Sequence, residues 1–239
     1  MKSFFLIFLC SFSLFAKESF FATFDPPKGW LVSDPSKYEK GIKVGFIASN
    51  RQIFTPSMTY AVEKVGEINM ETYLNALRKI HCHHRMQELG TFQSNAGKTH
   101  LIQIDLKNEW GEIRLLQAIS LHMGYALIQT ASCLKKDFLK WHETFLSSFK
   151  SFTTYPNVFA SCVEPLFEEK IKVLARCFQK YRSTSKDDIH TLFASPFFQK
   201  NQWEPFVKYL EKRLQSKGAC WQLLAIKHIQ ETLLTESDP

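Results

Sequence analysis

The sequence lacks the short motifs by which common catalytic and cofactor sites are recognised. HExxH, GxSxG, GxGxxG and CxxC are all absent from its 239 residues. Nothing therefore indicates a zinc peptidase helix, a serine-hydrolase elbow, a dinucleotide-binding turn or a thioredoxin-like redox pair. Residues 96–99 (AGKT) imitate the end of a phosphate-binding loop, but Phe92 stands where that loop needs glycine. We interpret the segment as a hairpin turn, and we expect neither enzymatic activity nor a cofactor.

Concentrated charge is also missing. The formal net charge is +7, from 30 basic and 23 acidic residues, yet no run of five or more like charges occurs. The electrostatic footprint of a nucleic-acid-binding protein is therefore weak, and we expect no nucleic-acid partner. A modest spread of positive charge remains compatible with peripheral contact to an anionic membrane surface.

Long apolar runs are absent except at the N-terminus. Lys2 precedes the largely apolar residues 3–15, and Ala16 precedes the polar sequence KES. A membrane span needs about 20 apolar residues, so this run predicts a cleaved signal peptide at residues 1–16. The mature protein is then periplasmic or secreted. An uncleaved N-terminal anchor is the alternative, whereas a lipoprotein signal is disfavoured because bulky residues precede Cys10.

Six cysteines occur, and five of them follow the predicted cleavage site. An odd number leaves at least one thiol unpaired in an oxidising compartment. Two of them lie on one predicted helix and would be separated by about 22 Å, too far to bond; either could pair with Cys220 instead. We expect buried free thiols, because a chain of this length can form a core without disulfides. The five are Cys82, Cys133, Cys162, Cys177 and Cys220.

Residues 17–153 mix strand and helix patterns. Asn69 is a capping residue for a first helix, which the run 81–85 (HCHHR) closes. A second helix follows from about residue 135, with a stripe of aromatic residues at helical spacing. Strands are expected at residues 43–48, 57–65, 113–120 and 125–131, and a hairpin at 93–106. The order β-β-α-β-β-β-α predicts a mainly antiparallel sheet flanked by helices, an α+β domain.

Turn residues at 153–157 (TTYPN) interrupt this pattern, and we place a domain boundary there. Helical periodicity prevails beyond it, which predicts a small all-helical C-terminal domain at residues 154–239. Four helices are expected. Their predicted starts are Ser161-x-x-Glu164 followed by Pro165, Ser185-x-x-Asp188, Glu204-Pro205, and Trp221.

A series of short motifs runs through residues 24–153 in an informative order. They are Pro27-Lys28-Gly29-Trp30, residues 54–59 (FTPSMT), Tyr73-Leu74, Leu89-Gly90, Ala96-Gly97-Lys98, Trp110-Gly111-x-Ile113-Arg114-x-x-Gln117, Tyr125-Ala126-x-Ile128-x-Thr130-Ala131 and Phe145-x-x-Ser148-Phe149. In this order they resemble the PsbP/Mog-like superfamily, which includes DcrB-type exported proteins of bacteria. The resemblance implies an antiparallel sheet between helices and non-enzymatic roles, in photosystem assembly, Ran binding or the envelope. It transfers no catalytic or ligand residue, and it does not extend beyond residue 157.

The densest group of metal-ligand side chains is the run 81–84 (HCHH). On a helix, His81 and His84 share a face at spacing i, i+3, but zinc sites use three or four ligands. We favour a solvated helix end whose imidazoles face the negative end of the helix dipole. His81 and His84 are kept as the candidates for a metal site.

Aromatic residues gather in the stretch 196–203, which has a loop-like composition. Packing between helices is the favoured interpretation, because large aromatics are commonly buried. The alternative is a surface that docks a protein partner, since aromatics are enriched at the centres of interfaces. The protein-binding candidates are Phe197, Phe198 and Trp203.

These observations together predict an exported protein of the bacterial envelope that acts by binding an unidentified protein partner. An assembly factor or a scaffold fits best, because catalytic motifs are missing. The alternatives are an envelope hydrolase, a thiol-redox enzyme or a secreted effector.

Overall fold

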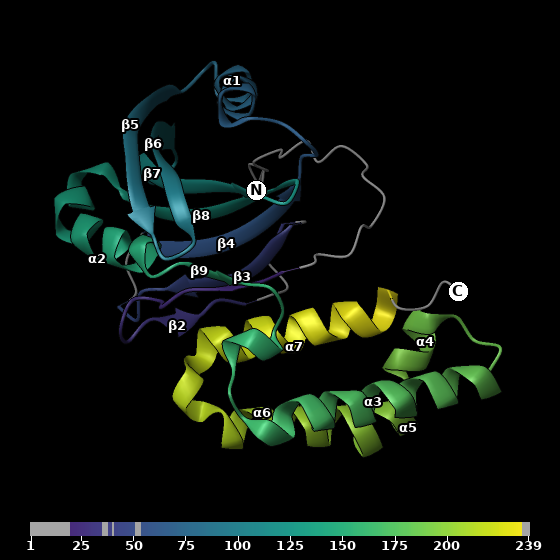
Figure 1. Ribbon diagram of the computed structural model, residues 1–239. Helices are drawn as coiled ribbons and strands as arrows, with labels where there is room; N and C mark the ends of the chain where they lie inside the picture. The colour runs from purple at the N-terminus through teal and green to yellow at the C-terminus, as the bar shows by residue number, and fades with distance from the viewer. Residues whose placement is uncertain (1–19, 35–37, 40, 51–53, 236–239) are drawn as a thin grey trace.

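The structure is a computed structural model that describes residues 20–34, 38–39, 41–50 and 54–235. The predicted signal peptide, residues 1–16, lies outside these described residues. Within them, no helix is both long and apolar enough to cross a membrane. Figure 1 shows an antiparallel sheet with helices against it and a group of further helices beside it. The predicted α+β fold with a helical C-terminal part is confirmed.

The described residues form one seven-stranded antiparallel sheet and one two-stranded sheet. Across the larger sheet the order is β2-β3-β4-β8-β7-β6-β5. Turns at residues 94–97, 110–111 and 123–124 join β5 to β6, β6 to β7 and β7 to β8. The strands are β2 (Leu31–Val32), β3 (Ile42–Ile47), β4 (Ser57–Lys64), β5 (Arg85–Ser94), β6 (Gly97–Asn108), β7 (Gly111–His122) and β8 (Tyr125–Leu134).

The two helices of the sheet domain cover opposite faces of the sheet. Helix α1 (Met70–Ile80) buries Tyr73, Leu74 and Leu77 against apolar side chains of β6, β7 and β8. Helix α2 (Phe138–Lys150) buries Phe145 and Phe149 against the alternate side chains of β4, β7 and β8. Because successive strand residues point to opposite faces, each central strand serves both helices.

Strand β5 corrects the expected element order. Three strands are expected between the two helices, and the structure has four, β5 to β8. Helix α1 ends at Ile80, and Arg85 starts β5 instead of closing the helix. The strand lies at the edge of the sheet and is mostly exposed, with a register shift between Glu88 and Gly90. An exposed edge strand has no buried face, so its sequence carries little of the alternation that predicts strands.

A second correction concerns residues 153–157, which are expected to form only a turn. Strand β9 (Thr153–Tyr155) pairs with β1 (Phe21–Thr23) near the start of the described chain. This two-stranded sheet brings the entry and the exit of the sheet domain together. Residues so far apart in the sequence have no local signal of their pairing.

The C-terminal part is helical, as predicted, but its details differ. Ser161 does not cap α3; it lies in a preceding 3₁₀ turn, and Glu164 is the residue before the helix. The stretch 196–203 is helical rather than a loop, because α5 continues through a π-helical turn at Gln199–Trp203 into α6. The helices are α3 (Pro165–Thr184), α4 (Ile189–Ala194), α5 (Pro196–Phe198), α6 (Glu204–Arg213) and α7 (Gly218–Thr235).

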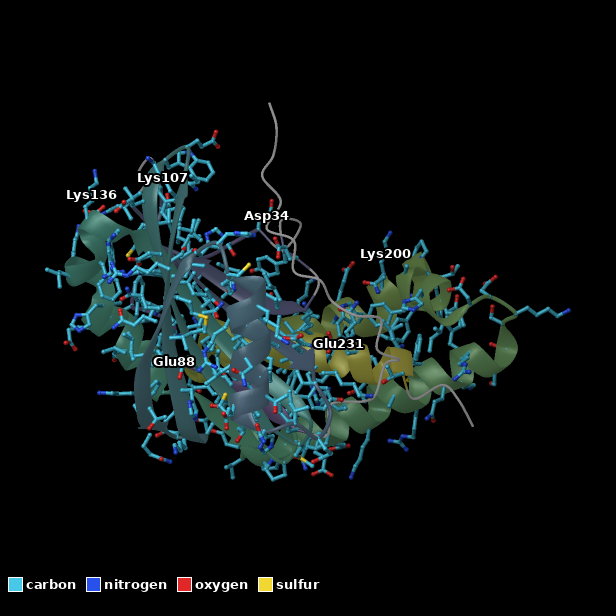
Figure 2. The ribbon with its side chains drawn as sticks, turned by 90° about the horizontal axis from the view of Figure 1, so that it is seen from above. Asp34, Glu88, Lys107, Lys136, Lys200 and Glu231 are labelled. Carbon is cyan, nitrogen blue, oxygen red and sulfur yellow. The ribbon has the colours of Figure 1, made fainter. Side chains whose placement is uncertain are left out.

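One hydrophobic core runs across the predicted domain boundary. Helix α7 packs against β1 and β3, and the Phe21 and Trp221 rings lie 6.1 Å apart between centroids. The contact is reinforced by Lys43 Nζ, 2.8 Å from Glu231 Oε2, and by Lys227 Nζ, which donates to the Ile42 carbonyl oxygen at 2.9 Å. Figure 2 labels Glu231, which belongs to the C-terminal helix of residues 218–235. The helical part therefore shares its core with the sheet domain.

Candidate binding site

A cavity of about 250 Å³ opens on the face of the sheet that carries α1. Helices α2 and α7 share the opposite face, whereas α1 alone covers this one and reaches only part of it. The uncovered floor consists of outward side chains of β4, β8 and β7. The cavity thus exists because a seven-stranded sheet is wider than one short helix can cover.

The floor of the cavity is polar at its centre. Strand register places Ser57 beside Ser132, and their hydroxyl oxygens lie 2.7 Å apart. In the next row Thr59 lies beside Thr130, which lies beside Gln117. The Gln117 amide Nε2 donates to Thr130 Oγ1 at 3.2 Å, although Gln117 is only 4% exposed. Five hydrogen-bonding side chains therefore occupy adjacent positions of the sheet.

Beside the cavity, Ser33 and Tyr38 form a wall over Gly45 of β3, which pairs with the lining residue Thr59. A Cβ at Gly45 would lie 2.5 Å from Ser33 Oγ and 3.2 Å from the Tyr38 hydroxyl, so a side chain there would collide with this wall. The Gly45 backbone amide donates to the Tyr38 hydroxyl at 2.7 Å, and that hydroxyl donates to the Ser33 carbonyl oxygen at 3.1 Å. Tyr38 is thereby fixed over the sheet and positions the adjacent Glu39 at the rim.

Two carboxylates line the cavity, Glu39 on this wall and Glu63 near α1. Burial raises the pKa of the Glu39 carboxyl above its usual value, because the charged form loses solvation. Glu63 Oε2 accepts a hydrogen bond from the Tyr73 hydroxyl at 2.9 Å, which ties the rim to α1. The described lining residues include no lysine, arginine, histidine or cysteine. They can hold a ligand by hydrogen bonds and charge, but they present no nucleophile paired with a base.

The two metal candidates lie at the far end of α1. His81 caps that helix and is 6% exposed, whereas His84 is exposed, and their ring centroids lie 6.0 Å apart. Burial and the nearby His84 lower the pKa of His81. Among the described residues, no group of three or more histidine, cysteine or acidic side chains could hold a metal ion. His81 and His84 remain a pair of candidate ligands, and the preference for a helix end without a metal stays a prediction.

The three aromatic candidates are divided between core and surface. Phe198 is 1% exposed and packs on Phe178 and Phe193, and Trp203 is 8% exposed and packs on Phe193. Phe197 points outward, is 60% exposed and touches only the ring of Tyr181 among the described aromatic side chains. Of the three, Phe197 alone is accessible to a partner in this structure.

The five described cysteines are all free thiols. Burial raises the pKa of the Cys133 thiol to about 12, and it does the same for Cys220. A thiol with so high a pKa carries almost no reactive thiolate at neutral pH. Cys82 is exposed, but it lies on the outside of the turn after α1, away from the cavity.

The cavity is the feature that sequence reasoning missed. A signal was present, because Thr59 and Gln117 occupy strand positions whose neighbours are mostly apolar. Reading it as a site required the register of three strands, which places Gln117 beside Thr130 and Thr130 beside Thr59. It also required the placement of Glu39 and Gly41, which lie outside the described helices and strands.

No model of a protein family matches this chain, and no curated protein does. Solved structures similar to it include LpqN of Mycobacterium tuberculosis, which is described as involved in cell envelope biogenesis. The two sequences are 12% identical, the match covers 58% of this chain and 85% of LpqN, and the TM-score is 0.44. Another is the cyanobacterial PsbP of Synechocystis, with 12% identity, 62% and 99% covered, and a TM-score of 0.39. A third is the Ran-binding protein Mog1p of Saccharomyces cerevisiae, with 12% identity, 55% and 88% covered, and a TM-score of 0.38. A PsbP protein and a Mog1 protein are thus among the solved structures that are similar to this chain.

Proposed function

We propose that this protein is an exported envelope protein that acts by binding, as an assembly factor or scaffold, and not by catalysis. The observation that carries the proposal is the sheet cavity, which combines hydrogen-bonding side chains with apolar walls and has no nucleophile–base pair among its described lining residues. Concave, largely apolar sites with a few placed polar groups are typical of ligand binding. Export rests on the predicted signal peptide at residues 1–16.

The two surfaces available for contact are the cavity and the area around Phe197. Removing the C-terminal helices would not separate them cleanly, because α7 covers Phe20, Phe21 and Phe46 of the shared core. Substitutions at single surface positions in the full mature chain are the sound alternative. Leu115 lines the cavity, Phe197 lies on the helical part, and Leu139 is an 86% exposed apolar side chain on α2 that serves as a matched control.

A photo-crosslinking amino acid at each of these three positions tests the proposal in intact cells. We expect discrete cross-linked products at Leu115 or Phe197 and only background at Leu139. Products of the same mass and yield at all three positions would show non-specific contact and contradict the proposal. Products confined to Leu139 would contradict it as well, because they would place the binding surface on α2.

A further inference from the structure

We propose that the sheet cavity binds the ammonium group of a primary amine that carries a short apolar chain. The inference rests on the proposed function, since it names the ligand class for the same cavity. It is carried by the arrangement of two carboxylates, two unused hydrogen-bond acceptors and an apolar wall around one volume of about 250 Å³.

The described cavity lining is negatively charged, whereas the chain as a whole is positively charged. The chain has a formal net charge of +7, yet Glu39 and Glu63 are the only charged side chains among the described lining residues. An anionic ligand would meet two like charges and no described cation, whereas a cation would meet two carboxylates. Charge complementarity therefore selects a cationic ligand over an acid or a phosphate.

Both carboxylates can accept further hydrogen bonds or an ion pair. No described lysine, arginine or histidine forms an ion pair with Glu39 or Glu63. Glu63 uses Oε2 for the Tyr73 hydroxyl, and its Oε1 accepts no hydrogen bond from a described residue. The Glu39 carboxyl accepts no hydrogen bond from another described residue, and burial raises its pKa because the charged form loses solvation. A bound cation would supply the missing interaction.

The floor supplies acceptors rather than only charge. The Gln117 side chain is buried and uses its Nε2 on Thr130, which leaves its carbonyl Oε1 without a donor among the described residues. The Thr59 hydroxyl likewise has no partner among them. An ammonium group carries three donors and no acceptor, so it matches a site with carboxylate, amide and hydroxyl oxygens. A hydroxyl ligand offers only one donor.

The remaining lining is apolar and sets the size of the ligand. Ile42, Ala61, Leu115 and Ile128 lie on the cavity face and contribute aliphatic side chains. A volume of about 250 Å³ corresponds to roughly eight water molecules at about 30 Å³ each. A chain of about six carbon atoms fits this space, as in a lysine side chain or a small aliphatic amine.

The test compares three probes of equal length on the mature protein: hexylamine, 1-hexanol and hexanoate. Backbone amide shifts in an NMR titration report both the affinity and the place of binding. We expect hexylamine to shift amides of β4 and β8 around Thr59 and Thr130, with an affinity about tenfold or more above that of hexanol or hexanoate, as hydrogen bonds to a charged group allow.

Two substitutions connect the preference to the carboxylates. E39Q and E63Q are each expected to weaken hexylamine binding at least about threefold and to leave the binding of hexanol unchanged. Glutamine keeps an acceptor for the Tyr73 hydroxyl at position 63, and Glu39 lies outside the strands, so at least E39Q tests the idea without disturbing the sheet. The control is E169Q, at an exposed position of α3 far from the lining, which should change nothing.

Equal affinity for the three probes would overturn the inference, as would hexylamine binding that ignores both substitutions or shifts amides outside the cavity. These outcomes do not affect the proposed function. The cross-linking experiment uses no amine, so a partner found at Leu115 together with no amine preference would keep the binding role and reject only the ligand class.

Discussion

Phe197 and Phe198 are adjacent in the sequence, and the structure predicts opposite consequences of truncating them. Phe198 is 1% exposed, and its ring centroid lies 4.8 Å from Phe178 and 5.5 Å from Phe193. Phe197 is 60% exposed, with one tilted ring contact at 5.5 Å to Tyr181. The same substitution, phenylalanine to alanine, therefore creates a cavity at one position and removes little at the next.

The magnitudes follow from burial. Truncating a fully buried phenylalanine costs about 3–5 kcal/mol, through lost transfer free energy and the residual cavity. A change at an exposed position usually stays within about 0.5 kcal/mol. For a chain of this length, 1 kcal/mol corresponds to a shift of about 2–4 °C in Tm, so F198A should lower Tm by about 6–20 °C. F197A should lower it by about 2 °C or less.

The same pair of variants tests whether sheet and helices form one cooperative unit. Phe198 belongs to a core cluster that also contains Phe21 and Phe46 of the sheet domain. If that cluster is continuous, F198A must weaken the sheet as well as the helices. Hydrogen-exchange mass spectrometry separates the two, because peptides from β8 and from α7 are measured independently.

We expect protection in β8 and in α7 to fall together in F198A, and to be unchanged in F197A. Loss of protection in α7 alone would show that the helical part unfolds by itself, which contradicts the shared core and favours the boundary at residues 153–154. Equal destabilisation by F197A and F198A would refute the packing argument itself.

Two further predictions concern ionisable groups. Under native conditions at pH 8, iodoacetamide should modify Cys82 and spare Cys133 and Cys220. Burial raises the pKa of the Cys133 and Cys220 thiols to about 12, so they carry almost no thiolate. Rapid labelling of either buried thiol, measured by mass spectrometry, would instead favour a thiol-redox role. The Asp105 carboxylate accepts two hydrogen bonds from Arg114, at 2.7 and 2.8 Å, and these lower the pKa of Asp105. A lowered pKa in the folded state contributes stability above the unfolded pKa of about 3.9, which is lost as pH falls through the folded value. D105N should therefore lower the free energy of unfolding in urea by about 1–3 kcal/mol at pH 7. The difference in this free energy between D105N and the original protein should shrink below about pH 4. A difference that does not depend on pH would contradict the ion pair.

Much of the local structure is written in the sequence. Strands β7 and β8 are largely apolar because each must supply side chains to α1 on one face and to α2 on the other. The aromatic stripe of α2 places Phe145 and Phe149 in the core, at 0% exposure, as helical spacing predicts. The tight turns between β5 and β8 coincide with Gly97, Gly111 and Gly124, which all adopt positive φ.

The sequence alone could not decide which aromatic side chains are buried. Phe197 and Phe198 have identical side chains and neighbouring positions, so composition cannot rank them. Only the docking of α5 against α3 and α4 turns one ring inward and the other outward. The sequence also gives no signal for the pairing of β1 with β9, because each strand is three residues long and the two strands lie far apart in the sequence.

The sequence by itself determined the longer helices, most of the strands and their antiparallel order, since these depend on periodicity and turn residues within a few positions. The tertiary structure decided what lies on the surface. The sheet cavity needs three strands in register and a helix too short to cover the whole face. Those conditions are relations between distant residues, and packing in three dimensions is what brings them together.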